Sequence, residues 1–139
     1  MRREVLTWRD IDKLIDHLIP QFEGEIDAMI MITRGGLVPG GMLAEALKMT
    51  TILTAAVDFP AELEGESERA KAGLRAWPKF FQFPEDVLLR GKRVLVVDDV
   101  WGSGRTITAV RNRVLGAGGA APSGGLHFNP DRRPFGNRR

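Results

Sequence analysis

The sequence has no cysteine and no tyrosine, and its only two histidines are His17 and His127. Without cysteine the chain can form neither a disulfide nor a thiolate metal site. The two histidines stand too far apart in the sequence to make a local metal-binding motif, so we expect each to be a structural or surface residue. The composition therefore excludes cysteine chemistry and offers no metal motif.

Long apolar runs and a large net charge are also missing. No apolar stretch approaches the length of a membrane span, and the N-terminus lacks the apolar stretch of a signal peptide. Twenty lysines and arginines against eighteen acidic residues leave a net charge of +2, too small to indicate a general nucleic-acid-binding surface. We therefore expect a soluble cytoplasmic protein without membrane or nucleic-acid partners, for which small anions are candidate ligands.

The chain alternates between helical and strand patterns. At 139 residues it can bury one hydrophobic core but not two, so we expect a single domain over residues 1–139. Thr7 as N-cap, with Asp10 three residues later, predicts a helix that ends at Pro20. The predicted strands are 26–32, 51–57, 94–97 and 124–128. Such alternation predicts an α/β fold with a central parallel sheet and ligands at the carboxyl ends of its strands.

Two adjacent carboxylates follow a strongly apolar strand in the segment 94–106, which reads Val-Leu-Val-Val-Asp-Asp-Val-Trp-Gly-Ser-Gly-Arg-Thr. Its first four residues suit a strand buried on both faces. Asp98 and Asp99 then stand at the carboxyl end of that strand, where a parallel sheet binds ligands.

The turn after the carboxylates has the composition of a phosphate site. Gly102 and Gly104 let the backbone curl so that several N–H groups point inward, while Ser103 and Thr106 add hydroxyl donors. The apolar residues that follow recur at helical spacing: Ile107, Val110 and Val114. The positive N-terminal end of this helix would face the same phosphate dianion.

Other phosphate motifs fit this segment less well. A P-loop needs Gly-x-x-x-x-Gly-Lys-Ser/Thr, which is absent, and the dinucleotide fingerprint needs a third glycine where this chain has Ile107. The remaining alternative is a buried strand, a polar turn and an ordinary capped helix.

A second glycine-rich turn follows the predicted strand 26–32, in the sequence Thr-Arg-Gly-Gly-Leu-Val-Pro-Gly. Arg34 supplies positive charge there, and Gly35 and Gly36 supply room for an anion to approach the backbone. The alternative is a plain strand-to-helix turn with a solvated arginine.

Together the two turns resemble the substrate loops of the type I phosphoribosyltransferases, which use phosphoribosyl pyrophosphate (PRPP). The resemblance implies that Asp98 and Asp99 bind the ribose hydroxyls, and that Arg34, Gly35 and Gly36 bind pyrophosphate. It also implies a cis Arg34–Gly35 peptide bond. The 5′-phosphate would be held by Gly102, Ser103, Gly104, Arg105 and Thr106.

The resemblance extends to the fold and to segments whose sequence patterns are weaker. It implies a single-domain α/β fold with a central parallel sheet flanked by helices, a small hood and a flexible loop. The region 58–91, whose periodicity is poor, occupies the place of that loop, with Arg75, Trp77 and Lys79 as candidate closing residues. The candidate base-binding residues are Trp101, Phe128, Asn129 and Asp131.

The implied reaction transfers the 5-phosphoribosyl group of PRPP to a purine base, a 6-oxopurine in the first instance, and releases pyrophosphate. Catalysis would depend on Asp98, Asp99 and Arg34. The implied cofactor is Mg²⁺, bound mostly through substrate and water and touching Asp98 and Asp99 indirectly. The resemblance also implies a homodimer.

One position departs from the purine-using enzymes of this family. In those enzymes the two carboxylates are followed by two apolar residues, here Val100 and Trp101, and then usually by an aspartate that handles the proton of the attacking nitrogen. Here that residue is Gly102. Two alternatives therefore stand beside the enzyme: a non-catalytic sensor of PRPP or a nucleotide with the same fold, and a phosphoribosyltransferase for another base.

Overall fold

The computed structural model describes residues 7–22, 25–59, 77–99, 104–120 and 126–127. Within them a five-stranded sheet has the order β3-β2-β1-β4-β5. The strands are β1 (Ala28–Ile32), β2 (Ile52–Asp58), β3 (Lys79–Gln82), β4 (Val94–Asp98) and β5 (Leu126–His127). The helices are α1 (Trp8–Leu18), α2 (Leu37–Ala46) and α4 (Arg105–Gly116), with short 3-10 turns at η1 (Ile19–Gln21) and η2 (Asp86–Leu88).

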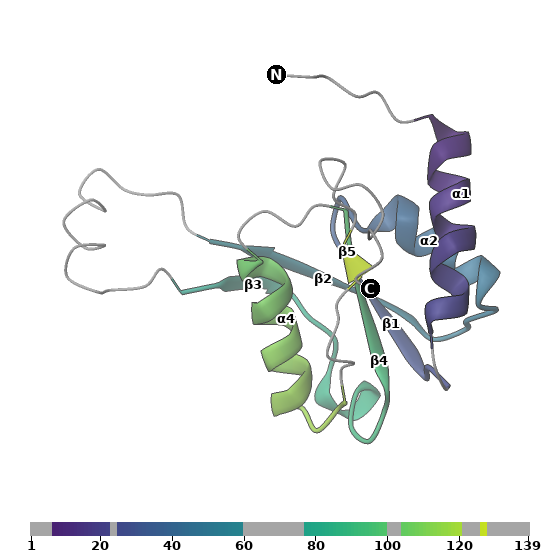
Figure 1. Ribbon diagram of the computed structural model, residues 1–139. Helices are drawn as coiled ribbons and strands as arrows, with labels where there is room; N and C mark the ends of the chain where they lie inside the picture. The colour runs from purple at the N-terminus through teal and green to yellow at the C-terminus, as the bar shows by residue number, and fades with distance from the viewer. Residues whose placement is uncertain (1–6, 23–24, 60–76, 100–103, 121–125, 128–139) are drawn as a thin grey trace, which may run out of the picture.

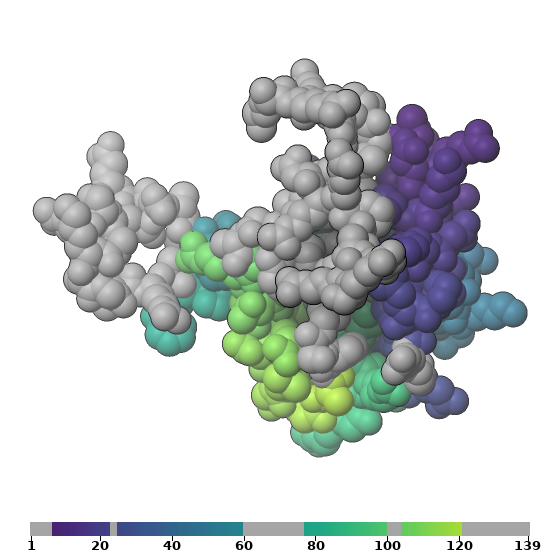
Figure 2. Space-filling view, in the orientation of Figure 1, coloured from purple at the N-terminus to yellow at the C-terminus, as the bar shows by residue number. Residues whose placement is uncertain are grey.

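Helices cover both faces of this sheet, with α4 on one side and α1 and α2 on the other (Figure 1). Figure 2 shows α4 and α1 at opposite sides of the molecule. Alternate residues of the central strands enter the two layers, so Ile30 and Val96 pack toward Val110 of α4. Met29 and Leu95 pack toward the α1 and α2 side. The expected α/β fold with buried central strands is confirmed.

The capping box predicted for the first helix is present. The Thr7 N–H donates to Asp10 Oδ2 at 2.9 Å, and the Asp10 N–H donates to Thr7 Oγ1 at 3.3 Å. The hydrogen bond from Thr7 lowers the pKa of the Asp10 carboxyl. The α-helix ends at Leu18, and Pro20 lies in the 3-10 turn that follows. These caps fix the direction of α1 across the sheet.

The region 58–91 is not wholly a loop. Residues Lys79–Gln82 form strand β3, which pairs antiparallel with β2 and makes the sheet mixed. The Thr54 and Gln82 side chains are hydrogen-bonded to each other across this pair, at 2.7 Å from Gln82 Nε2 to Thr54 Oγ1. The central strands β2, β1, β4 and β5 are parallel as expected, and β3 adds an antiparallel strand at the edge within the region expected to be a loop.

The strands β1 and β4 are the parallel neighbours at the middle of the sheet. Their register places Met31 opposite Val97. The chain leaves β1 toward α2 and returns to β2 on one side, whereas β4 lies on the other side, so the strand order reverses between β1 and β4. Such a reversal opens a crevice at the carboxyl ends of the two strands. No helix among the described ranges is long and apolar enough to cross a bilayer.

Candidate functional site

The glycine-rich turn after β1 meets the paired carboxylates at the carboxyl end of β4. Gly35 lies so close to Asp99 that a Cβ atom at Gly35 would overlap the Asp99 carboxylate. Gly36 approaches backbone in the same way, because a Cβ there would lie 2.8 Å from the Ile32 carbonyl oxygen and would overlap that of Val97. The absence of a side chain at these two positions therefore lets the turn pack against Asp99 and the backbone of β1 and β4.

The turn after β1 presents backbone donors. The Gly36 N–H donates to Ile32 O at 2.8 Å and the Leu37 N–H donates to Arg34 O at 3.1 Å, which turns the chain into α2. No described carbonyl accepts a hydrogen bond from the Arg34 or Gly35 N–H group. The Arg34 side chain is exposed beside these amides. A cation next to unpaired N–H groups is a suitable environment for an anion.

A cis peptide bond occurs in this turn, between Thr33 and Arg34. The expected position, Arg34–Gly35, is wrong by one residue. The cis bond thus precedes the arginine, and the close approach to Asp99 belongs to the glycine that follows it.

The paired carboxylates stand at the end of β4, where burial changes the chemistry of Asp98. Asp98 is the last residue of β4, and its Oδ1 accepts a hydrogen bond of 2.9 Å from the Asp99 N–H. Burial raises the pKa of the Asp98 carboxyl to about 6; the nearby Asp99 carboxylate adds to this rise and the hydrogen bond opposes it. Two adjacent carboxylates repel each other, and such a pair is typical of a site that binds hydroxyl donors or cations.

The helix α4 begins at Arg105, directly after Gly104. Gly104 adopts a left-handed conformation with φ of 75° and provides no side-chain cap. The Thr108 N–H donates to Gly104 O at 3.0 Å, which starts the helix. This bond closes the first turn of the helix, which Arg105 and Thr106 begin. The side chain of Arg105 lies over the ring of Phe59.

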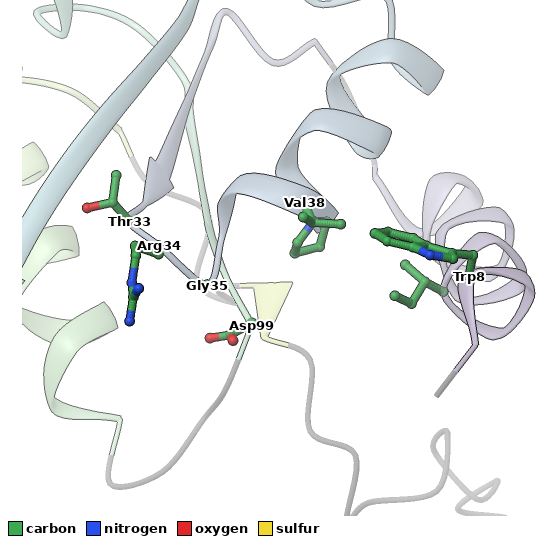
Figure 3. Close-up of a pocket in the computed structure, with 8 residues that line it drawn as sticks. Trp8, Thr33, Arg34, Gly35, Val38 and Asp99 are labelled. Atoms are coloured by element: carbon green, nitrogen blue, oxygen red, sulfur yellow. The ribbon is translucent and has the colours of Figure 1, made fainter. Parts of the chain in front are cut away.

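A cavity of about 840 Å³ opens at this edge of the sheet (Figure 3). One wall is polar and carries Arg34, Thr33 and the Asp99 carboxylate, whereas the opposite wall is apolar and carries Trp8 and Val38. The complete lining is Trp8, Ile11, Thr33, Arg34, Gly35, Val38, Pro39 and Asp99. A cavity of this size with convergent charges at one wall can hold a phosphorylated sugar with an attached group.

The apolar wall was not predicted as part of the site. Trp8 is the first residue of α1 and is 69% exposed, so its ring borders the cavity and does not enter the core. A signal for it exists in the sequence, because Trp8 stands three residues before Ile11 and therefore continues the apolar face of α1 beyond the sheet.

Several predicted site residues lie outside the described residues. For the phosphate turn these are Gly102 and Ser103, and for the base site they are Trp101, Phe128, Asn129 and Asp131. Of the candidate closing residues, Arg75 also lies outside them. Trp77 is 83% exposed, and the Lys79 ammonium lies 5.0 Å from the centre of the Phe81 ring.

The described residues hold no group of three or more acidic or histidine side chains suited to a metal ion. Asp98 and Asp99 nevertheless provide carboxylate oxygens, the ligand type that Mg²⁺ prefers. Two carboxylates fit an ion that takes most of its ligands from substrate and water.

Comparison with known proteins agrees with this geometry. The family model described as phosphoribosyl transferase domain matches residues 3–122. The xanthine-guanine phosphoribosyltransferase of Ruegeria sp. (strain TM1040) is 33% identical over 107 residues, a match covering 76% of this chain and 54% of that protein. This chain therefore spans about half the length of that curated relative.

Two solved structures show the same fold. The purine phosphoribosyltransferase of Pyrococcus horikoshii Ot3 superimposes with a TM-score of 0.67 at 22% identity, over 96% of this chain and 97% of that one. A hypothetical protein from Neisseria gonorrhoeae, crystallised with bound ppGpp, superimposes with a TM-score of 0.65 at 28% identity, over 89% of this chain and 79% of that one. The family match over residues 3–122 identifies this chain as a member of the phosphoribosyl transferase domain family.

Proposed function

We propose that the protein is a phosphoribosyltransferase that transfers the 5-phosphoribosyl group of PRPP to a purine base and releases pyrophosphate. The observation that carries this proposal is the approach of Gly35 to the Asp99 carboxylate, which brings the two predicted substrate loops together. A ligand that touches both loops would place an anionic group near Arg34 and hydroxyl donors near the carboxylates. PRPP has this form.

In this proposal each loop binds one part of PRPP. Asp98 and Asp99 accept hydrogen bonds from the ribose hydroxyls. The N–H groups at the start of α4, with the turn before it, hold the 5′-phosphate. The 5′-phosphate residues remain those expected from the sequence: Gly102, Ser103, Gly104, Arg105 and Thr106.

The leaving group is assigned to the other loop. The Arg34 guanidinium and the N–H groups of Arg34 and Gly35 stabilise the charge that builds on pyrophosphate as the bond to C1′ breaks. Mg²⁺, when bound, would neutralise part of the pyrophosphate charge, and Asp98 and Asp99 are the residues that would hold its water shell. The protein itself supplies position and charge, since the ribose becomes cationic as pyrophosphate leaves.

The acceptor is proposed to be a 6-oxopurine. The name of the Ruegeria relative, which refers to xanthine and guanine, supports this choice. Trp101, Phe128, Asn129 and Asp131 are the proposed base contacts. We also propose that one domain spans residues 1–139, that the protein forms a homodimer, and that its small-molecule partners are PRPP and the base.

A second candidate is a non-catalytic protein of this family that binds PRPP or a nucleotide as a signal. Gly102 favours this candidate, because the acidic residue expected of a purine-using enzyme is missing there. The ppGpp bound to the similar protein of Neisseria gonorrhoeae also favours it.

Turnover separates the two candidates. Pyrophosphate release would be measured with PRPP and Mg²⁺ while hypoxanthine, guanine, xanthine, adenine, uracil and orotate are supplied one at a time, and binding of PRPP and ppGpp would be measured by calorimetry. We expect release with a 6-oxopurine. Binding of PRPP or ppGpp without release for any base would support the signal-binding protein.

A further inference from the structure

The apolar wall of the cavity is built from two different helices. Trp8 and Ile11 belong to α1, whereas Val38 and Pro39 belong to the first turn of α2. The Trp8 side chain is 69% exposed and that of Val38 is 45% exposed. In Figure 3 the Trp8 indole extends from α1 toward Val38. These side chains therefore form an apolar surface that is open to a ligand in the cavity.

Exposure of an aromatic side chain does not by itself indicate a ligand site, and a second exposed ring in this protein shows the difference. Phe81 is 63% exposed on β3, at the edge of the sheet away from α1 (Figure 1), and it is not among the residues that line the cavity. Trp8 instead lies in a group with three other apolar side chains at a cavity wall. Apolar side chains grouped in this way, with charged groups on the facing wall, are typical of a ligand-binding surface.

The order of the groups along the cavity separates the parts of a bound substrate. Figure 3 shows the Asp99 carboxylate between Arg34 on one side and Val38 and Trp8 on the other. In the proposed function the pyrophosphate lies at Arg34 and the ribose lies at Asp99. Phosphate and hydroxyl groups bind charged and hydrogen-bonding partners, so neither part of PRPP uses the apolar wall. That wall is therefore free for the reactant that is neither phosphate nor sugar.

The geometry of the transfer places the acceptor on the same side. As pyrophosphate leaves, its oxygen takes the electron pair of the bond to C1′, while the acceptor nitrogen donates its lone pair to C1′ and loses its proton to a base, which can be water. Since pyrophosphate still occupies one face of C1′ while its bond breaks, the acceptor must approach the other face. Arg34 lies on the leaving-group side of Asp99, so the acceptor side is that of Trp8 and Val38.

We propose that Trp8 binds the acceptor of the transfer by stacking its indole on a planar nitrogen heterocycle, with Val38 as part of the same apolar surface. This inference rests on the proposed function, because it assumes that pyrophosphate lies at Arg34 and ribose at Asp99. An indole face stacks on any flat heteroaromatic ring and is tolerant of the groups at the ring edge. Trp8 therefore selects a flat ring as acceptor and does not distinguish one purine from another.

The test is a calorimetric titration of three probes into the wild type and three variants. GMP and AMP carry a base, whereas ribose 5-phosphate is the same sugar phosphate without one. Trp8→Leu removes the aromatic face, and Trp8→Phe keeps a smaller one. Phe81→Leu is the matched control, because it removes a ring of similar exposure that does not line the cavity.

We expect the wild type to bind at least one of the two nucleotides more tightly than ribose 5-phosphate. Trp8→Leu should weaken binding of that nucleotide by about fivefold to a hundredfold, the loss that follows removal of one stacked aromatic ring. Its affinity for ribose 5-phosphate should stay within about twofold of the wild type, because that probe has no ring to stack. Trp8→Phe should lose less than Trp8→Leu, and Phe81→Leu should bind all three probes as the wild type does.

A second measurement needs no substitution that could disturb folding. In the wild type with the bound nucleotide, a nuclear Overhauser effect should connect the purine ring proton at carbon 8 or carbon 2 with the indole protons of Trp8. The Trp8→Phe variant assigns those indole signals by their disappearance. Absence of any such effect in the saturated complex would contradict the proposed stacking.

The titrations distinguish failure of this inference from failure of the proposed function. If the wild type binds the nucleotide and Trp8→Leu binds it equally well, Trp8 does not contact the base, while the proposed function stands. Equal weakening of the nucleotide and of ribose 5-phosphate by Trp8→Leu would also overturn the inference, because the effect would not depend on the base. If the wild type binds neither PRPP nor any of the three probes, the proposed function fails and the inference fails with it.

Discussion

Gly35 lies against the carboxylate of Asp99, so closely that no side chain can replace the glycine hydrogen without moving that carboxylate. The two residues belong to different turns, one after β1 and one after β4, and adjacent parallel strands bring them together. Each turn alone is a strand-to-helix connection. Their juxtaposition makes a site that can bind both an anion and a hydroxylated group.

A methyl group at Gly35 should therefore damage the site. In Gly35→Ala the new Cβ displaces the Asp99 carboxylate, and overpacking of this kind costs about 1–3 kcal/mol of unfolding free energy. We expect lower stability in urea and a loss of PRPP affinity measured by calorimetry.

Gly41→Ala is the control for that substitution. Gly41 lies within α2, and a Cβ there would meet no atom within 4 Å. Because alanine favours a helix over glycine, this variant should gain up to about 1 kcal/mol and keep its PRPP affinity. Equal affinity in both variants would show that Gly35 is not part of the ligand site.

Substitution of Arg34 should weaken binding of the pyrophosphate group alone. Replacing it by methionine removes the exposed cation beside the Gly35 amide and should weaken PRPP binding by about tenfold to a hundredfold, the loss of a charge-assisted hydrogen bond. Ribose 5-phosphate, which has no pyrophosphate, should bind as before. The matched control is Arg90→Met, an exposed arginine on the turn before β4, at the opposite end of that strand. Equal weakening of both ligands would contradict the assignment.

Asp98 should make stability depend on pH. Its pKa in the folded protein is raised to about 6 from an ordinary value of 3.8, chiefly by burial, so the folded state binds more protons than the unfolded state between these values. Stability therefore falls as pH rises through this window. The loss is complete above pH 7 and amounts to about 1 kcal/mol for a half-exposed carboxyl.

The pH effect can be isolated by difference. Urea unfolding of the wild type and of Asp98→Asn between pH 4 and pH 8 should show the variant gaining stability relative to the wild type as pH rises. A constant difference across this range would mean that the Asp98 carboxyl is not perturbed. An NMR titration of the carboxyl carbon would then give an ordinary pKa.

Gly102 offers a test of the missing base. If the protein is an enzyme that lacks only a carboxylate at this position, Gly102→Asp should raise purine turnover, since a positioned general base contributes about 10²-fold or more. No gain in turnover would mean either that another group accepts the proton or that the chain does not catalyse transfer.

The central strands and the glycine-rich turn after β1 could be predicted because strong local signals agree there. Four consecutive apolar residues indicate a strand buried on both faces, and paired glycines indicate a close backbone approach. These two signals indicate one site because the carboxyl ends of neighbouring parallel strands lie at the same edge of the sheet. The helix start at Thr7 could also be predicted, since the capping box is a local sequence pattern.

Other features depend on tertiary contacts that no local pattern reveals. The strand β3 is four residues long, and its identity comes from pairing with β2 and from Phe80 facing α4. Trp8 borders the cavity because of where α1 crosses the sheet. The contact between Phe59 and Arg105 joins segments far apart in the sequence, and neither residue alone predicts it.

The central claim is that the carboxyl ends of β1 and β4 form one PRPP site, and the most direct test is PRPP titration into the wild type and Asp98→Asn/Asp99→Asn. The wild type should bind PRPP. The double variant should lose binding yet unfold at a denaturant concentration no lower than the wild type, because removing two adjacent like charges relieves repulsion. PRPP binding that survives in the folded double variant would place the site elsewhere and contradict the account.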